Sequence, residues 1–349
     1  MLKSSLAISS LFLLSWLLLA QSPPQKKSEP PPAERKGDLS VMTWNLGWFY
    51  DWDINDNQSE TAKINSAPSR AEWEWRLHAT SATIAKVKPT VLCLQEIENR
   101  KVLDALCAEL KTQHQLNYEV CFAQGRDSFT EQDVGILVLR GLRPQYRRAP
   151  EPRIQEQRRD EKSITKQIML ELPWGEGASL RRLTIINVHL MAGDDVGKEM
   201  DRCDQARFMK RWIRDEHRRG HYVILVGDMN TAEMRSNNLK ERAIDVLTGK
   251  DTDDKDDDLE DMVPQLPILD RITFPGRGST LDHILISPKL KTGPGLAYDS
   301  IRNRKDIVIR GEQPDSRLRG MDRRFWKVPQ DERDLSDHYP LQAIFKMKP

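Results

Sequence analysis

One short run limits the fold of this chain more than any other, because an apolar strand ends there in polar residues. Residues 223–226 read Val-Ile-Leu-Val and are followed by Gly227, Asp228, Met229 and Asn230. A strand that is apolar at every position is buried on both faces, so helices must cover its sheet in an α/β layer structure. Its polar end then emerges at the rim of the sheet, where such folds tend to carry their sites. Taken alone, Gly-Asp-x-Asn is also a common turn.

Other predicted strands end or begin in similar residues. The further strand exits are Asn45 after residues 41–44, Glu96 after the apolar run 90–94, and His189 after residues 183–188. Asp282, Asp337 and His338 stand just before predicted strands. In a sheet with antiparallel neighbours, the end of one strand lies beside the start of the next. We therefore expect one rim to carry eight side chains: Asn45, Glu96, His189, Asp228, Asn230, Asp282, Asp337 and His338.

The residue types in this set favour one kind of metal site. Glu96 and Asp337 are hard oxygen donors, which suit Mg²⁺ or Mn²⁺, with Ca²⁺ as a further alternative. The histidines bring no third nitrogen or sulfur ligand, which disfavours zinc. Such a metal would polarise a phosphoryl oxygen. Asp228 would then orient and deprotonate water, while Asn230 and His338 would hold the developing charge.

Strands and helices follow one another along the rest of the chain. Further strands are predicted at 118–123, 134–139, 167–172, 283–286 and 341–345. Three helices are predicted from the spacing of their apolar residues: one at 73–87, one that begins after an N-cap at Asn99, and one at 198–219. No internal repeat suggests a solenoid.

The N-terminus has the composition of an export signal. Lys3 supplies a positive charge, and residues 6–20 are apolar apart from three serines. This length is typical of a signal peptide and short for a membrane span. We predict cleavage after Ala20, with an uncleaved membrane anchor as the alternative. Residues 21–37 are rich in Pro, Lys, Glu and Gln and suit an extended linker, so the folded domain is expected at 38–349.

The overall charge does not identify a partner. The chain has 54 basic and 53 acidic side chains and a net charge of +1, so no global field recruits nucleic acid or an anionic membrane. Polyanion binding would have to come from local patches. Two segments, 140–166 and 302–333, are dense in arginine. They are interpreted either as solvated connectors or as contacts to phosphate groups.

Two other features leave alternatives open. Export would permit disulfides among the cysteines, for which three full pairings exist: Cys93, Cys107, Cys121 and Cys203. Cys93 lies in an apolar strand and is expected to be a small buried hydrophobic residue. The acidic run 251–261 lacks the Gly and the closing Glu of an EF-hand loop, so we expect a mobile surface loop there.

Six short motifs resemble, in order, those of the endonuclease/exonuclease/phosphatase superfamily. They are Trp44-Asn45, Leu94-Gln95-Glu96, Asn187-Val188-His189-Leu190, Gly227-Asp228-Met229-Asn230, Leu281-Asp282-His283-Ile284-Leu285 and Ser336-Asp337-His338. The superfamily includes DNase I-like nucleases, abasic-site endonucleases, sphingomyelinases and inositol-polyphosphate 5-phosphatases. The resemblance covers essentially the whole chain after Gly37. It implies a four-layer α/β sandwich, in which two mixed β-sheets pack face to face with helices on the outer faces and the active site at one rim.

The resemblance also implies roles for the rim residues. Asn45, Glu96 and Asp337 are similar to the metal-site residues of the superfamily. Asp228 and Asn230 are similar to the pair that activates water and orients the phosphate.

The two histidines are assigned by the same resemblance. His338, oriented by Asp282, would contact the scissile phosphate as base or acid. His189 would be the second catalytic histidine of the DNase I-like branch, whereas abasic-site enzymes have a tyrosine there. The residue that orients His189 stays open, with Asp127 and Asp133 as candidates.

We therefore expect an exported, divalent-metal-dependent phosphodiesterase whose leading substrate class is nucleic acid, because His189 accompanies His338 and because the Arg-rich segments can grip phosphates. The enzyme alternatives are a sphingomyelinase, acting on a phospholipid, or an inositol-polyphosphate phosphatase of the same fold. A sphingomyelinase needs an exposed apolar hairpin, and none is evident in the sequence. A non-catalytic binding module would have lost catalytic residues, and none is missing. No stable protein partner is implied, and we expect a monomer.

Overall fold

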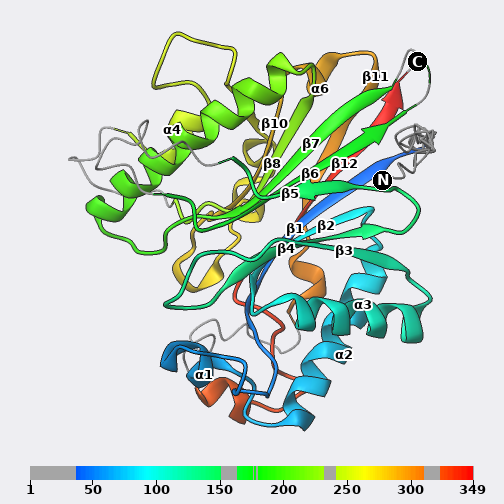
Figure 1. The fold of residues 1–349 in the computed structure, drawn as a ribbon, viewed down its shortest axis with the longest axis vertical. Coiled ribbons are helices and arrows are strands. Elements are labelled where there is room, and N and C mark those ends of the chain that lie inside the picture. The colour runs from blue at the N-terminus through cyan, green and yellow to red at the C-terminus, as the bar shows by residue number, and fades with distance from the viewer. Residues whose placement is uncertain are drawn as a thin grey trace, which may run out of the picture. The chain divides into compact units, whose positions relative to one another are not determined.

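Two mixed β-sheets form the centre of the computed structural model, which describes residues 37–150, 163–175, 177, 180–231, 241–309 and 323–348 (Figure 1). Within these residues each sheet has six strands. The first sheet contains, in spatial order, β11 (Gly295–Asn303), β12 (Leu341–Lys348), β1 (Leu39–Phe49), β2 (Val91–Ile97), β4 (Asp133–Leu139) and β3 (Tyr118–Phe122). The second contains β5 (Gln145–Arg147), β6 (Lys166–Trp174), β7 (Arg181–His189), β8 (Tyr222–Asp228), β10 (Asp282–Ile286) and β9 (Glu260–Asp261).

The pairing of the central strands brings the polar strand ends together. β1 runs parallel to β2 and sets Trp44 opposite Leu94. β7 runs parallel to β8 and sets His189 opposite Asp228. β10 runs antiparallel to β8, so Asp282 at its start lies opposite Asp228 at the end of β8. Strand ends and strand starts therefore meet at one rim, as the sequence predicted.

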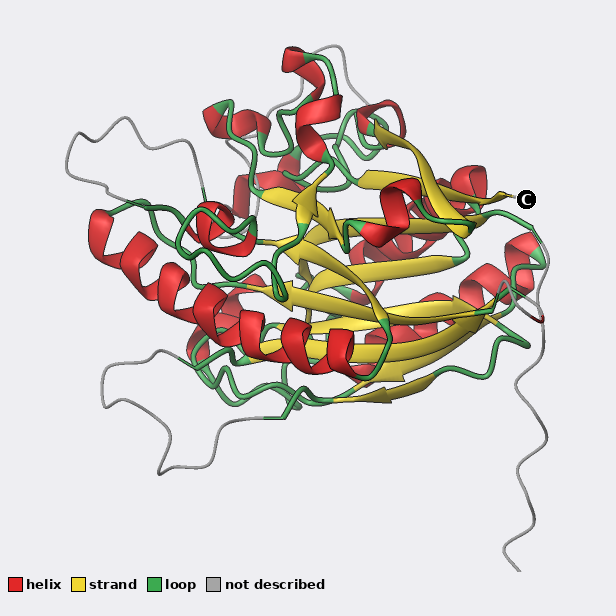
Figure 2. Cartoon of the chain, turned by 90° about the horizontal axis from the view of Figure 1, so that it is seen from above, coloured by secondary structure: helices red, strands yellow, loops and turns green. Residues whose placement is uncertain are grey.

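Helices cover the outer face of each sheet, which makes four layers with three apolar cores between them (Figure 2). The helices are α1 (Glu60–Asn65), α2 (Arg70–Val87), α3 (Arg100–His114), α4 (Val196–Arg218), α5 (Ala243–Leu247) and α6 (Lys289–Thr292). Cys93 and Ile185 lie in the core between the sheets. Leu106 of α3 packs on the first sheet, and Trp212 of α4 packs on the second. The predicted four-layer α/β sandwich is confirmed.

The burial of β8 explains why its sequence is apolar at every position. Ile224 and Val226 face the core between the sheets, while Val223 and Leu225 face the core under α4. Successive side chains of a strand point to opposite faces, and both faces are covered here. A charged residue is therefore placed at the end of the strand, where Asp228 stands.

The helix starts follow the local sequence signals. Asn99 caps α3, as predicted, because its side chain accepts a hydrogen bond from the backbone N–H of Val102 at 3.3 Å. Asp195 caps α4 in the same way, with the N–H of Lys198 at 3.0 Å. Each cap satisfies a backbone donor that has no partner within the helix.

Strand β11 was not predicted, because it lies in a charged segment without a regular alternation. Tyr298 and Ile301 are buried, whereas Asp299 and Arg302 are exposed. The register against β12 shifts between Tyr298 and Ser300. A bulge of this kind breaks the period of two on which strand prediction depends.

The acidic run 251–261 is a surface loop in part, because residues 252–256 are exposed, while its mobility stays a prediction. Lys210 Nζ lies 2.9 Å from a carboxylate oxygen of Asp251 and 3.0 Å from oxygens of Asp257 and Asp258. Asp257 is 1% exposed. Buried carboxylates persist where a cation pairs with them, so this run is anchored to α4.

All four cysteines are free in the structure, so none of the three possible disulfide pairings is formed. Cys93 is fully buried between the sheets, which confirms its predicted role as a small hydrophobic residue.

The predicted signal peptide at 1–20 and the predicted linker at 21–37, apart from Gly37, lie outside the described residues. Among the helices that the structure does describe, none is both long and apolar enough to cross a membrane.

Candidate active site

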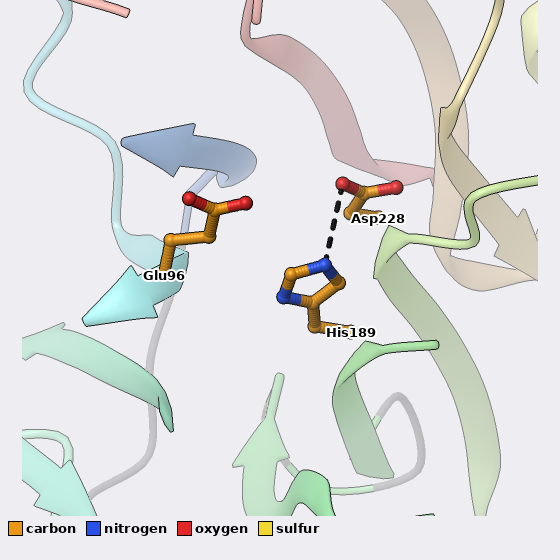
Figure 3. Close-up of side chains that lie close together, drawn as sticks. All are labelled: Glu96, His189 and Asp228. Carbon is orange, nitrogen blue, oxygen red and sulfur yellow. Dashed lines mark ion pairs between the residues drawn. The ribbon is translucent and has the colours of Figure 1, made fainter. Parts of the chain in front are cut away.

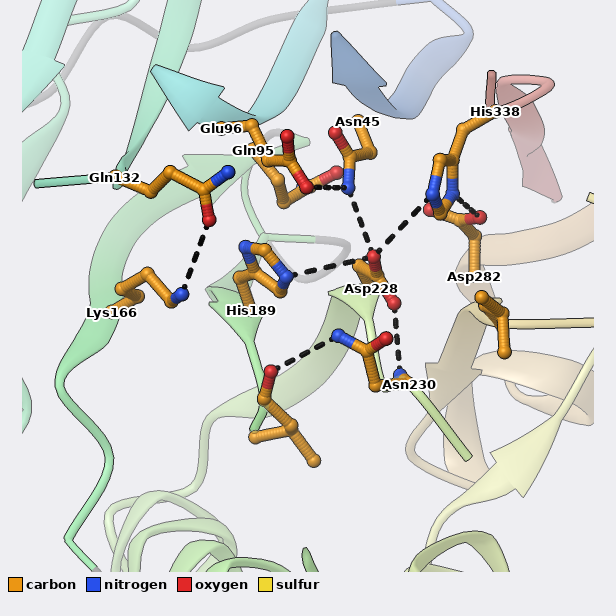
Figure 4. Close-up of polar contacts among 12 residues, drawn as sticks. Asn45, Gln95, Glu96, Gln132, Lys166, His189, Asp228, Asn230, Asp282 and His338 are labelled. Atoms are coloured by element: carbon orange, nitrogen blue, oxygen red, sulfur yellow. Dashed lines mark hydrogen bonds and ion pairs between the residues drawn. The ribbon is translucent and has the colours of Figure 1, made fainter. Parts of the chain in front are cut away.

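The predicted rim residues come together in the structure. Seven of them surround the end of β8 (Figure 4): Asn45, Glu96, His189, Asp228, Asn230, Asp282 and His338. Asp337, the eighth, is half-buried and approaches Gly47, where a Cβ atom would lie 2.7 Å from its Oδ1. Ser336 Oγ donates to the Asn45 carbonyl at 2.6 Å, which ties the segment before β12 to β1.

The carboxylate of Asp228 lies at the centre of this cluster. Asn45 Nδ2 donates to its Oδ2 at 2.9 Å, and the backbone N–H of Asn230 donates to its Oδ1 at 2.8 Å. His189 Nε2 and His338 Nε2 lie 3.7 and 3.8 Å from Oδ2. Burial, opposed by His338, raises the pKa of Asp228. A buried carboxylate with a raised pKa is suited to accept a proton at neutral pH.

The backbone is strained where these side chains are presented. Glu96 and Asn230 have φ values of 57° and 50°, which non-glycine residues rarely adopt. Such strain persists only where the surrounding structure fixes it, and it clusters at functional sites. Gly227 has φ 134°, and a Cβ there would lie 2.0 Å from the Val188 carbonyl oxygen. Glycine therefore allows β8 to approach β7 closely just before Asp228.

His338 is held between two aspartates. Asp282 Oδ2 lies 2.7 Å from His338 Nδ1, so the other ring nitrogen faces Asp228. The Phe274 ring packs on the imidazole with a centroid distance of 5.0 Å. Burial alone would lower the pKa of His338, but Asp282 and Asp228 raise it to about 10. The ring is therefore a cation at neutral pH and can donate a proton or a hydrogen bond to phosphate.

Glu96 and Asp337 make the oxygen-rich part of the rim. Glu96 Oε1 accepts a hydrogen bond from Asn45 Nδ2 at 3.1 Å, and its Oε2 accepts one from the Trp48 N–H at 2.8 Å. Burial and the nearby Asp337 raise the pKa of Glu96. No lysine or arginine of the described residues pairs with either carboxylate. Repelling carboxylates with amide oxygens beside them fit a divalent cation that prefers oxygen ligands.

A second grouping also includes Glu96. Potential ligand atoms of Glu96, His189 and Asp228 all lie within 4.8 Å of one another (Figure 3). The predicted metal set was Asn45, Glu96 and Asp337, so Glu96 is common to both. Glu96 is therefore the residue on which the proposed metal site depends most.

His189 has a different neighbour from those that the sequence suggested. Its Nδ1 is buried and has no hydrogen-bond partner among the described residues. Asp133 accepts a bond from the Gly125 N–H, and Asp127 accepts one from Lys166 Nζ at 3.1 Å, so neither candidate orients the ring. Lys166 lies opposite His189 across β6 and β7. Burial and then Lys166 lower the pKa of His189 well below its ordinary value, so the ring is neutral.

We expect Lys166→Met to raise the pKa of His189, because the lysine charge now lowers it. Asp127→Asn should shift the same pKa further down, since Asp127 partly neutralises Lys166. Titrations of the histidine ring protons by NMR in metal-free protein measure both shifts. An unchanged His189 pKa in both variants would show that Lys166 does not control the ring.

Sequence reasoning also missed a polar pair beneath the site. Gln95 Nε2 donates to Asn187 Oδ1 at 2.6 Å, which links β2 to β7 across the core between the sheets. Asn187 Nδ2 donates to the carbonyls of Leu94 and Gly135, both at 3.0 Å. Paired buried polar groups of this kind fix one arrangement of the strands, although Gln95 Oε1 has no hydrogen-bond partner among the described residues. Their position inside otherwise apolar strands was the available signal.

Four described arginines of the two Arg-rich segments bind protein groups. Arg147 pairs with Glu216 at 3.1 Å, and Arg148 donates to the Thr165 carbonyl at 3.3 Å. Arg304 pairs with Asp306 at 2.9 Å, and Arg333 pairs with Glu72 at 2.6 Å. Residues 151–162 and 310–322 lie outside the described residues. The phosphate-gripping interpretation therefore finds no support in these four arginines.

The sequence of the chain matches the model of one known protein family. The model of the Endonuclease/Exonuclease/phosphatase family matches residues 42–338. No curated protein matches the chain in a search by sequence.

Solved structures share the fold at low sequence identity. An endonuclease/exonuclease/phosphatase from Bacteroides vulgatus has a TM-score of 0.55 and 17% identity, over 90% of this chain and 100% of that one. D. rerio TDP2 complexed with a single-strand DNA product has a TM-score of 0.51 and 17% identity, over 89% and 99%. The human Nocturnin catalytic domain has a TM-score of 0.50 and 16% identity, over 88% and 94%. At such identities the likeness shows the fold alone.

Proposed function

This chain belongs to the endonuclease/exonuclease/phosphatase family, and from that membership and the rim geometry we propose that it is a divalent-metal-dependent phosphodiesterase acting on nucleic acid. The family hydrolyses phosphoester bonds, and that coarse activity follows from membership. One observation supports the proposed phosphodiesterase activity most strongly. The buried carboxylate of Asp228 is surrounded by two histidine rings and two asparagines, which are His189, His338, Asn45 and Asn230.

Each polar group around Asp228 has a place in phosphodiester hydrolysis. Asp228 orients a water molecule and accepts its proton as the oxygen attacks phosphorus. His338, held by Asp282, donates to the phosphate and protonates the leaving oxygen. The side-chain amide of Asn230 donates a 3.1 Å hydrogen bond to the Leu190 carbonyl, which fixes its position. This amide and the neutral His189 ring donate hydrogen bonds to phosphoryl oxygens of the substrate.

The metal belongs on the Glu96 side of the rim. Glu96, with Asn45 and Asp337, would hold Mg²⁺ or Mn²⁺. Bound there, the cation supplies Lewis-acid polarisation of a phosphoryl oxygen and neutralises charge on the leaving group.

Nucleic acid is the proposed substrate class for two reasons. His189 accompanies His338 on opposite sides of Asp228. The chain also shares its fold with a protein solved with a single-strand DNA product. One observation favours the lipid alternative, because Ile268 and Leu269 are 77% and 76% exposed on the loop before Phe274. Two adjacent apolar side chains give a small membrane contact, so sphingomyelin is the second candidate.

A substrate panel tests the proposal. Purified protein is incubated with Mg²⁺, Mn²⁺, Ca²⁺ or EDTA and with DNA, RNA, sphingomyelin vesicles or inositol phosphates. We expect cleavage of nucleic acid that EDTA abolishes. Cleavage of sphingomyelin alone would assign the protein as a sphingomyelinase. If none of the four substrates is hydrolysed, both the nuclease and the sphingomyelinase assignments are wrong.

The pH dependence follows from His338. Its pKa is raised above the ordinary value of about 6.5, so its proton is held through neutral pH and lost as pH rises through about 10. We expect the pH–rate profile to fall on the alkaline side near pH 10. In Asp282→Asn, the alkaline fall should move to lower pH, because a carboxylate that raises the pKa is gone. If the alkaline limb of the pH–rate profile does not move in Asp282→Asn, His338 is not the proton donor.

Export is proposed from the N-terminal sequence, with the secreted or periplasmic space as destination and a membrane-anchored form as the alternative. Mass spectrometry of the protein recovered from the host tests this. A mature N-terminus at Gln21 supports a cleaved signal, and an intact Met1 in the membrane fraction supports the anchor.

A further inference from the structure

A bulge near the end of β1 shapes the Glu96 side of the rim. The register of β1 against β2 shifts after Asn45, so that residues 46–48 of β1, here called the β1 bulge, lie opposite Glu96 alone. Gly47 and Trp48 within it have φ values of 61° and 52°, in the left-handed region. A bulge disrupts the ladder of backbone hydrogen bonds, and a strained backbone persists only where other contacts fix it. The shape of the β1 bulge must therefore be held by its surroundings.

A buried arginine of α2 holds the carbonyl groups of the β1 bulge. Arg76 Nη1 donates to the Trp48 carbonyl at 2.6 Å. Its Nη2 donates to the Leu46 carbonyl at 2.7 Å and also to the Gly47 carbonyl. The residue is 4% exposed. A guanidinium presents its donors in one rigid plane, so this single side chain fixes three successive carbonyls.

The N–H groups of the β1 bulge face the rim residues. The Gly47 N–H donates to Asn45 Oδ1 at 2.9 Å, and the Trp48 N–H donates to Glu96 Oε2 at 2.8 Å. Because Gly47 engages the oxygen of the Asn45 amide, the nitrogen of that amide is directed to Glu96 and Asp228 (Figure 4). The β1 bulge therefore links the buried guanidinium to two of the residues proposed to hold the metal.

Aromatic rings fix the guanidinium of Arg76 in turn. Its Cζ lies 5.5 Å from the ring centroid of Phe49 and 5.9 Å from those of Phe325 and Trp326. Attraction between a cation and an aromatic face is strong where water is excluded, so these rings stabilise the buried charge. The guanidinium is thus held from one side by rings and from the other by the β1 bulge.

A second arginine of the same aromatic cluster provides a matched comparison. Arg333 is 2% exposed, and its Cζ lies 5.1 and 5.3 Å from the ring centroids of Phe325 and Trp326. Its guanidinium pairs with Glu72 and donates to the carbonyls of Trp326 and Val328. Among the described residues, the hydrogen bonds of Arg333 do not reach the β1 bulge. Arg333 therefore shares the burial and the rings but not the contact to the rim.

We propose that Arg76 is a positioning residue for the divalent cation, which raises the metal affinity of the rim by holding the β1 bulge in the shape that orients Asn45 and Glu96. The inference rests on the proposed function, because it needs a metal at Glu96. Residues that orient metal ligands from behind contribute about ten- to a hundredfold to affinity. The charge of Arg76 alone would repel a cation. A positioning role and a purely electrostatic role thus predict opposite effects when Arg76 is replaced by a neutral residue.

Mn²⁺ binding measures this role without any substrate. Electron paramagnetic resonance follows free Mn²⁺ as the metal is added to purified protein, and the binding lost in Glu96→Gln identifies the rim site. We expect Arg76→Met to weaken Mn²⁺ binding at this site about tenfold or more. Arg76→Lys keeps the charge but lacks the planar fork, so it should also bind Mn²⁺ more weakly than the wild type. Arg333→Lys is the matched control and should bind Mn²⁺ as the wild type does.

The outcomes separate this inference from the proposed function. If the wild type binds Mn²⁺ at Glu96 and Arg76→Lys binds it equally well, the positioning role is overturned and the proposed function stands. Tighter binding by Arg76→Met would show that its charge outweighs its position. Equal weakening in Arg76→Lys and Arg333→Lys would assign the effect to the aromatic cluster, and either result overturns the inference. If Glu96→Gln removes no Mn²⁺ binding from the wild type, the proposed metal site fails and the inference fails with it.

Discussion

Replacing Asp228 with asparagine is expected to lower kcat about a thousandfold or more while the protein stays folded. The amide keeps the size of the side chain but cannot accept a proton from water. The loss should appear in kcat more than in KM, since the groups that hold the phosphate are untouched. Steady-state hydrolysis of an oligonucleotide with Mg²⁺ measures it.

The stability of the same variant provides an independent check. The raised pKa of Asp228 means that its ionisation is disfavoured in the folded protein. That penalty is absent below the unfolded-state pKa of about 3.9, grows as pH rises from there to the folded-state pKa, and is complete above it. Metal-free Asp228→Asn should therefore melt at a higher temperature than the wild type at pH 8, and the difference should shrink near pH 4. A lower melting temperature at pH 8 would contradict the electrostatic account of the rim.

Replacing Arg202 with methionine is expected to destabilise the protein by about 3–5 kcal/mol, because it leaves a buried carboxylate without its cation. Arg202 and Glu199 have side chains that are 1% and 0% exposed, with Arg202 Nε 2.8 Å from a Glu199 oxygen. The other Glu199 oxygen accepts bonds from Thr231 Oγ1 and the Ala243 N–H, at 2.7 and 2.8 Å. The pair thus anchors Thr231, which directly follows Asn230, and Ala243 at the start of α5.

The double variant Glu199→Gln with Arg202→Met is the matched control for this prediction. Removing both charges should recover much of the lost stability, since no uncompensated charge remains. Chemical denaturation of the wild type, Arg202→Met, Glu199→Gln and the double variant measures the coupling. If Arg202→Met and the double variant were equally unstable, packing would account for the loss in place of the buried charge.

The fold was predictable because its strongest signals are local. Short apolar runs such as 90–94 and 223–226, bounded by polar residues, indicate buried strands, and the spacing of apolar residues in α3 shows which face it buries. The rim was predictable for the same reason. Polar residues at strand ends need a topology that brings them together, and parallel β7 and β8 beside antiparallel β10 do so.

The features that were missed depend on contacts between distant segments. Lys166 reaches His189 through the register of β6 against β7, and no local pattern in either strand encodes that register. The ion pairs of the acidic run were not predicted, because their cation, Lys210, lies on α4, more than forty residues earlier in the chain. The missing partner of His283 Nε2 is likewise apparent only in the folded chain.

We propose that the cluster around Asp228 hydrolyses phosphodiester bonds with the help of a divalent cation at Glu96. The most direct measurement is cleavage of an end-labelled single-stranded oligonucleotide by the wild type and Asp228→Asn, purified in parallel, with Mg²⁺ and with EDTA. The account predicts cleavage by the wild type with Mg²⁺, none in EDTA, and a rate at least about a thousandfold lower in Asp228→Asn. Equal rates in the two proteins, or cleavage that persists in EDTA, would contradict it.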